Sequence, residues 1–150
     1  MAKFKYKLQS VLEIKEKLES QEKIAYGLAT AKVLEEQEKL HGLMLQKAEY
    51  DKRARDLVKG DIDLLEIKFC RNAVDTMKAR IRGQMIELHR AQKQQELARQ
   101  RLNNVMIERK TYEKLREKKM DEFKQELLLE EKKEIDELVS YTFNQEEEQV

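Results

Sequence analysis

An uninterrupted seven-residue repeat in the second half of the chain limits the possible folds more than any other feature. Two rows of positions, offset by three residues, run through residues 74–126. The first row is Val74, Ile81, Leu88, Gln95, Leu102, Arg109, Arg116 and Phe123, and the second is Met77, Gln84, Ala91, Ala98, Val105, Tyr112, Lys119 and Glu126. Such rows are the a and d positions of a coiled coil, in which polar members weaken pairing but fix its register. The repeat predicts a long helix that buries only a narrow seam.

The composition favours helix throughout the chain and argues against a conventional globular domain. Among the 150 residues there is no proline, and 41% are charged, whereas globular domains carry about 25%. The abundant residue types (Ala, Glu, Lys, Leu, Arg and Gln) are strong helix formers. Disorder is the alternative for so charged a chain, but apolar residues make up 40% of it and recur at helical spacing. We therefore expect an all-α fold.

The first half carries a similar seam, which its apolar residues divide into two phases. The first phase comprises Val11, Ile14, Leu18, Ala25 and Leu28. After an insertion of four residues, the second phase comprises Val33, Leu40, Leu43, Tyr50, Ala54 and Leu57. Such an insertion is a stutter, which locally unwinds a supercoil without ending the helix. We therefore predict one helix through this half, with a change of phase between Leu28 and Val33.

A turn signal separates the two halves at VKGDIDLLEI, residues 58–67. Gly60 suits the left-handed conformation that ends a helix, and either Asp61 or Asp63 suits the N-cap of the next one. We predict a long antiparallel two-helix coiled-coil hairpin that forms a single domain over residues 1–150. Its expected parts are helix 1 at about 4–59, a turn at about 60–62, helix 2 at about 63–140, and an acidic solvated tail at 144–150.

In this hairpin the second helix outlasts the first and overhangs it at the C-terminal end. A turn centred near residue 61 places position i opposite position 122 − i. The start of helix 1, near residue 4, therefore lies opposite about residue 118. The apolar residues beyond that point are Phe123, Leu127, Leu128, Ile135, Leu138, Val139, Tyr141 and Phe143. An unpaired amphipathic end is either frayed or available to another protein.

The residue pattern contains no catalytic, cofactor-binding or metal-binding motif. His41 and His89 are the only histidines, and in the predicted register they lie about nine positions apart, too far to share a metal ion. Cys70 is the single cysteine and is best interpreted as a small apolar filler. There is no phosphate-binding glycine loop and no nucleophile motif. We therefore expect a protein that is not an enzyme and uses no cofactor.

Charge is distributed unevenly along the chain. Residues 78–119 hold 13 Lys or Arg against 5 Glu, and residues 120–150 hold 11 Asp or Glu against 3 Lys. A basic segment suits phosphate binding, but here glutamates are interspersed and no aromatic array is present for base stacking. A solvated helix surface is favoured over a nucleic-acid site. The chain also has no apolar run that could span a bilayer or act as a secretion signal, so we expect it in the cytoplasm.

Three stretches resemble the flagellar export protein family FliJ. The start FKYKLQSVLEIKEKLE, residues 4–19, is similar to the basic and aromatic opening of that family. The stretches ERKTYEKLREKKMDEF, residues 108–123, and EEKKEIDELV, residues 130–139, resemble its C-terminal region. The length, the absence of proline and the turn in mid-chain extend the resemblance over nearly the whole chain.

This resemblance implies a non-enzymatic component of the flagellar type III export apparatus. Proteins of the family form an antiparallel coiled coil similar to the central stalk of rotary ATP synthases. They are cytoplasmic and peripheral to the inner face of the cell membrane, which they reach only through partners. The implied partners are the ring of the flagellar export ATPase, the cytoplasmic domain of the export gate protein FlhA, and export chaperones.

By the same resemblance, the end that carries both termini enters the ATPase ring and the turn end faces the gate. The candidate residues for the ring are Arg109, Lys110, Arg116, Lys119, Met120, Phe123 and Leu127. The candidates for the gate or chaperones are Leu43, Tyr50 and Phe69. Each apolar candidate has an alternative as a seam residue, and each charged one as solvated surface. We expect a monomer when the protein is alone; a structural spacer or dimerisation rod without a secretion role is the alternative.

Overall fold

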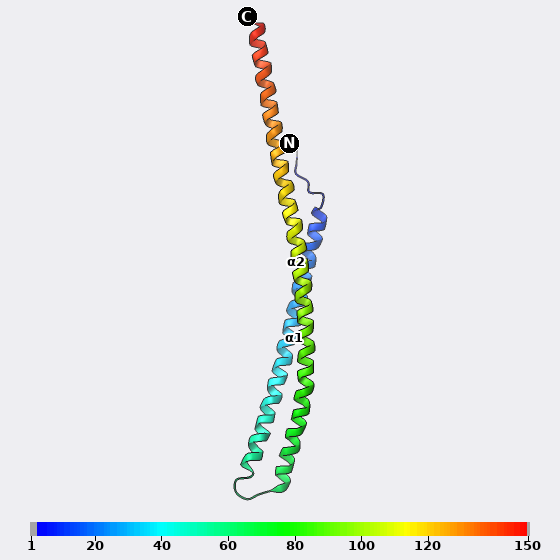
Figure 1. Ribbon diagram of the computed structural model, residues 1–150, viewed down its shortest axis with the longest axis vertical. Helices are drawn as coiled ribbons and strands as arrows, with labels where there is room; N and C mark the ends of the chain where they lie inside the picture. The colour runs from blue at the N-terminus through cyan, green and yellow to red at the C-terminus, as the bar shows by residue number, and fades with distance from the viewer. Residues whose placement is uncertain (1–2, 150) are drawn as a thin grey trace. The chain divides into compact units, whose positions relative to one another are not determined.

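Two long helices account for nearly all of the described chain, which comprises residues 3–149 of a computed structural model. Helix α1 spans Gln9–Asp56 and helix α2 spans Leu64–Glu148 (Figure 1). They pack against each other as an antiparallel hairpin, and the described residues contain no strand. The predicted all-α two-helix fold is confirmed.

The turn between the helices uses the residues that the sequence indicated. Gly60 has a φ of 104°, and it is the only described residue with a positive φ. Asp63 caps α2, because its Oδ1 accepts hydrogen bonds from the backbone N–H groups of Leu65 and Glu66, at 3.1 and 3.3 Å. The structure thereby decides between the two candidate caps, and a carboxylate at this position also stabilises the positive end of the helix dipole.

The chain divides into two compact units. The turn unit comprises Ser20–Asn104, and the terminal unit comprises residues 3–19 and 105–149. In the turn unit, Cys70, Val74, Met77 and Ile81 of α2 are buried, and Val33 of α1 is buried too. Cys70 is fully buried, as expected for an apolar filler.

Contacts inside each unit follow the predicted register. In the turn unit, the Nε2 atom of Gln84 donates to the backbone oxygen of Glu36 at 3.0 Å. In the terminal unit, the Nζ atom of Lys15 lies 2.7 Å from the Oε2 atom of Glu108. Both pairs agree with position i facing 122 − i to within two residues. The placement of the turn near Gly60 therefore sets the pairing of the arms.

The predicted change of phase in α1 is wrong. Buried and half-buried residues recur in steps of three and four along the helix without interruption: Leu12, Lys15, Glu19, Glu22, Tyr26, Ala29, Val33, Glu36, Leu40, Leu43, Lys47, Tyr50, Ala54 and Leu57. Of the expected first phase, Val11, Leu18 and Ala25 are half-buried beside this row, but Ile14 and Leu28 are 55% and 69% exposed. The phase is kept by polar side chains, which find partners on α2 and therefore occupy seam positions normally held by apolar residues.

Both outer helix ends also differ from the prediction. α1 begins at Gln9 and not near residue 4, because Phe4 and Tyr6 are half-buried against α2 while Lys3, Lys5 and Lys7 are exposed. That alternation has a period of two, which a helix cannot maintain. α2 continues to Glu148, so residues 144–148 of the predicted solvated tail are helical. No glycine or proline follows Gly83 to end the helix sooner.

Candidate partner-binding surfaces

The far end of α2 carries exposed apolar side chains on one face. We name this set the C-terminal stripe: Leu128, Ile135, Leu138, Val139 and Phe143. Its members are 59–65% exposed, and all of residues 128–149 are exposed. Their spacing of seven, three, one and four residues gathers them on one side of the helix. In Figure 1 this part of α2 runs on beyond the N-terminal segment. It is an amphipathic helix with no partner helix among the described residues.

Phe123 is not part of this bare region, which corrects the expectation that it lacks a partner within the hairpin. Residues 3–8, which we name the N-terminal strap, lie against α2 at this point. The Phe4 and Phe123 ring centroids are 5.6 Å apart, and the Arg116 guanidinium lies 5.8 Å from the Phe4 centroid. The Tyr6 hydroxyl donates to the Tyr112 backbone oxygen at 3.2 Å. The unpartnered surface therefore begins after residue 127.

The other candidates for the ring lie in the terminal unit in three different environments. Arg109 is a half-buried seam residue whose guanidinium contacts Glu113 at 2.8 Å and also pairs with Glu19. The hydrogen bonds that Arg109 donates to the carboxylates of Glu113, the largest cause, and of Glu19 raise the pKa of Arg109 above its usual value. Lys110 is exposed, and exposed Lys119 lies 3.4 Å from Glu122. The two remaining apolar candidates, Met120 and Leu127, are half-buried.

The candidates for the gate lie in the turn unit, and only one of them is a surface residue. Leu43 and Tyr50 occupy half-buried seam positions of α1. Phe69 is 60% exposed on α2. Their binding roles remain predictions, although seam burial leaves Leu43 and Tyr50 less surface to offer.

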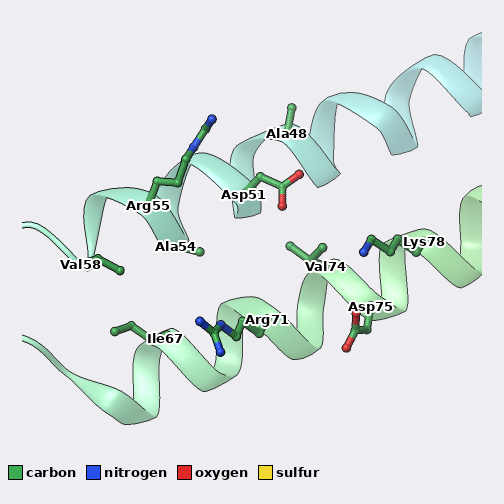
Figure 2. Close-up of a pocket in the computed structure, with 10 residues that line it drawn as sticks. All are labelled: Ala48, Asp51, Ala54, Arg55, Val58, Ile67, Arg71, Val74, Asp75 and Lys78. Carbon is green, nitrogen blue, oxygen red and sulfur yellow. The ribbon is translucent and has the colours of Figure 1, made fainter.

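The turn unit also contains a groove that sequence patterns did not reveal. Figure 2 shows Ala54 of α1, Val58 just after α1, and Ile67 and Val74 of α2 around this groove, which has a volume of about 620 Å³. The lining residues Ala48 and Ala54 of α1 are small, so the space between the helices is not filled. The alanines are visible in the sequence, but only the partner helix shows that nothing compensates for their size.

Polar side chains of α1 and α2 pair repeatedly along the seam, and these pairs favour one register of the two helices. In the turn unit, buried Glu36 accepts hydrogen bonds from Gln84 and lies 3.0 Å from the Lys32 ammonium group. These hydrogen bonds, with that from Gln84 the largest cause, lower the pKa of Glu36 from its usual 4.5 to about 2. Gln95, which belongs to the other row of the α2 repeat, donates to the Thr30 hydroxyl at 3.2 Å.

The candidate sites among the described residues 3–149 are surfaces for protein partners. Within residues 3–149, no three His, Cys, Asp or Glu side chains are grouped in a way that suits a metal ion. Over the same residues, neither helix has a segment long and apolar enough to cross a bilayer. The features that remain are the C-terminal stripe, the N-terminal strap and the groove of the turn unit.

Comparison with known proteins identifies the family. The family model described as flagellar FliJ protein matches residues 4–148. This chain belongs to the FliJ family. FliJ proteins are non-catalytic components of flagellar protein export, and the chain has a role related to that process. No curated protein and no solved structure matches the chain. The match includes residues 4–8 of the strap, the turn and the C-terminal stripe.

Proposed function

We propose that this FliJ-family protein acts as a non-enzymatic coiled-coil stalk of the flagellar export apparatus. In this role it binds the ring of the export ATPase, links the ring to the cytoplasmic domain of the export gate protein FlhA, and escorts export chaperones. It works in the cytoplasm at the base of the flagellum and reaches the membrane only through these partners. The family match supports the setting, and the surfaces described above support the division of contacts.

The C-terminal stripe is the single observation that carries the contact with the ATPase ring. Five large apolar side chains on an exposed helix face are costly to leave in water, at about 25 cal/mol per Å² of apolar surface. A helix with such a face is typically recognised by an apolar groove or by other helices. Lys110 and Lys119 lie nearer to the strap and are exposed, so they add positive charge for acidic groups of the ring. We assign Met120, Phe123 and Leu127 to support of the strap at the edge of this contact.

Stimulation of the export ATPase by the purified protein tests this assignment. The stripe variant Ile135→Ala/Val139→Ala/Phe143→Ala keeps helix-forming residues at every position, so helix content is expected to stay the same. We expect its stimulation of ATP hydrolysis to fall at least about tenfold, because a loss of 1.4 kcal/mol in binding is a factor of ten.

The matched control is Ile86→Ala/Leu97→Ala/Ile107→Ala, which removes exposed apolar side chains of α2 outside the stripe. This control should stimulate like the wild type. Loss of stimulation in both variants would indicate a general effect of surface apolarity, and full stimulation by the stripe variant would show that the ring binds elsewhere. A pull-down with the FlhA cytoplasmic domain, using Phe69→Ala, tests the proposed gate contact separately.

A further inference from the structure

We propose that the groove of the turn unit binds the C-terminal stripe of a second copy of this chain. The pairing is head-to-tail, since one copy contributes the groove and the other contributes the stripe. It goes beyond the proposed contacts with the export apparatus, and it replaces the expectation that the protein is a monomer when alone.

The groove is long enough to hold a helix. A second hollow, of about 410 Å³, adjoins the first and shares Ala48, Asp51 and Lys78 with it. Met44 and Met85 extend the apolar lining into this second hollow. Methionine side chains adapt to irregular partners, which suits a surface that receives an apolar helix. Together the two hollows form one apolar furrow between α1 and α2 within the turn unit.

The rim of the furrow is basic. Five basic residues line it, namely Lys47, Arg55, Arg71, Lys78 and Arg82, against the acidic residues Asp51 and Asp75. Lys47 is paired with Asp51 at 3.0 Å. The other four basic residues are exposed, and none of them forms an ion pair with another residue of the described range 3–149. The furrow therefore presents unpaired positive charge beside an apolar floor.

The C-terminal stripe has the complementary chemistry. Residues 128–148 hold eight Asp or Glu against two Lys, a net charge of −6. Glu134 flanks the apolar face, whereas Glu131 and Lys132 interrupt it between Leu128 and Ile135, so the carboxylate of Glu134 is placed to meet a cation beside a groove. An acidic amphipathic helix and a basic apolar furrow thus occur on one chain, and each lacks a partner among the described residues. Opposite charge at both rims gives the pairing its direction.

Head-to-tail pairing predicts a specific behaviour of mixed variants. A groove variant, Arg71→Glu/Lys78→Glu, can still donate its stripe, whereas the stripe variant Ile135→Ala/Val139→Ala/Phe143→Ala can still offer its groove. Each variant alone should remain at the monomer mass of 18.0 kDa in sedimentation equilibrium. Their mixture should form a dimer of one copy each, because only one of the two possible contacts is left intact.

The wild type should show an average mass that rises with protein concentration at low salt and returns to the monomer value at high salt, since salt screens exposed charges. The control Arg80→Glu/Lys93→Glu changes two exposed basic residues of α2 outside the furrow and should associate like the wild type. Far-UV circular dichroism checks that every variant keeps its helix content.

Two results would overturn the proposal. One is a wild type that stays monomeric at every concentration and salt level. The other is association of the wild type together with failure of the two variants to pair, which would indicate symmetric contact. The measurement needs no ATPase, so its failure leaves the proposed ring contact standing. If the groove variant self-associates no longer but still stimulates the ATPase, both proposals are supported separately.

Discussion

Replacing Leu12 and, separately, Ile14 by alanine distinguishes the seam seen in the structure from the one that apolar spacing predicts. Leu12 is 3% exposed and Ile14 is 55% exposed, although the two lie only two positions apart. Each substitution removes three carbon groups, worth about 0.8 kcal/mol apiece when fully buried. At Leu12 nearly all of this stabilisation is lost, so the free energy of unfolding should fall by roughly 2.3 kcal/mol, and by more if a cavity remains. At Ile14 less than half is lost, roughly 1 kcal/mol, and alanine's higher helix propensity returns roughly 0.4 kcal/mol.

Urea unfolding followed by far-UV circular dichroism measures both effects. The free energy of unfolding should fall about four times further for Leu12→Ala than for Ile14→Ala, with unchanged dependence on urea concentration. An unchanged slope matters because it shows that the denatured and native states remain comparable. Equal losses, or a larger loss at Ile14, would mean that α1 buries the Ile14 phase, and the uninterrupted heptad described above would be wrong.

Three further changes test other parts of the fold. Glu36→Gln should remove a stabilisation that is full above pH 4.5 and disappears as pH falls towards 2, because the folded-state pKa of Glu36 is the lower one; urea unfolding across this range measures it. A double-mutant cycle on Phe4 and Phe123 should give a coupling of about 0.5–1.5 kcal/mol, and no coupling would show the strap to be unattached. Gly60→Ala should destabilise the fold by about 1–2 kcal/mol, because the φ of Gly60 is 104°. Gly42→Ala should stabilise it by up to about 1 kcal/mol, since a Cβ added there meets nothing within 4 Å. Thermal unfolding compares the two variants.

The sequence was sufficient for the features that depend on one residue or on a regular repeat. Gly60 was identifiable because glycine beside two potential caps occurs once in the chain. The seam of α2 was identifiable because buried Val74, Met77 and Ile81 follow the repeat directly. These features rest on local geometry, which sequence periodicity reports well.

The seam of α1 and the strap could not be predicted because they depend on the opposite helix. Glu19 resembles a surface residue until Arg109 is known to face it, so apolar spacing alone indicates Ile14 and Leu28 as seam residues instead. The expected helix 1 includes Phe4, but the ring of Phe4 instead packs on Phe123 from an extended segment, a contact that depends on α2. The furrow was invisible for the same reason, since alanines form a hollow only when the facing helix leaves it unfilled.

The polar pairs of the seam also determine where the C-terminal stripe begins. A purely apolar seam tolerates a slip of one heptad, because a and d positions coincide again after seven residues. In the terminal unit such a slip would separate Glu19 from Arg109 and Lys15 from Glu108. Glu19 would then lose the guanidinium that faces it from α2, and breaking such a buried ion pair is destabilising. The register that avoids this cost brings the strap to Phe123, so the length of bare α2 is fixed by paired charges. The residues that weaken the seam therefore also fix the length of helix that the proposed ring contact would use.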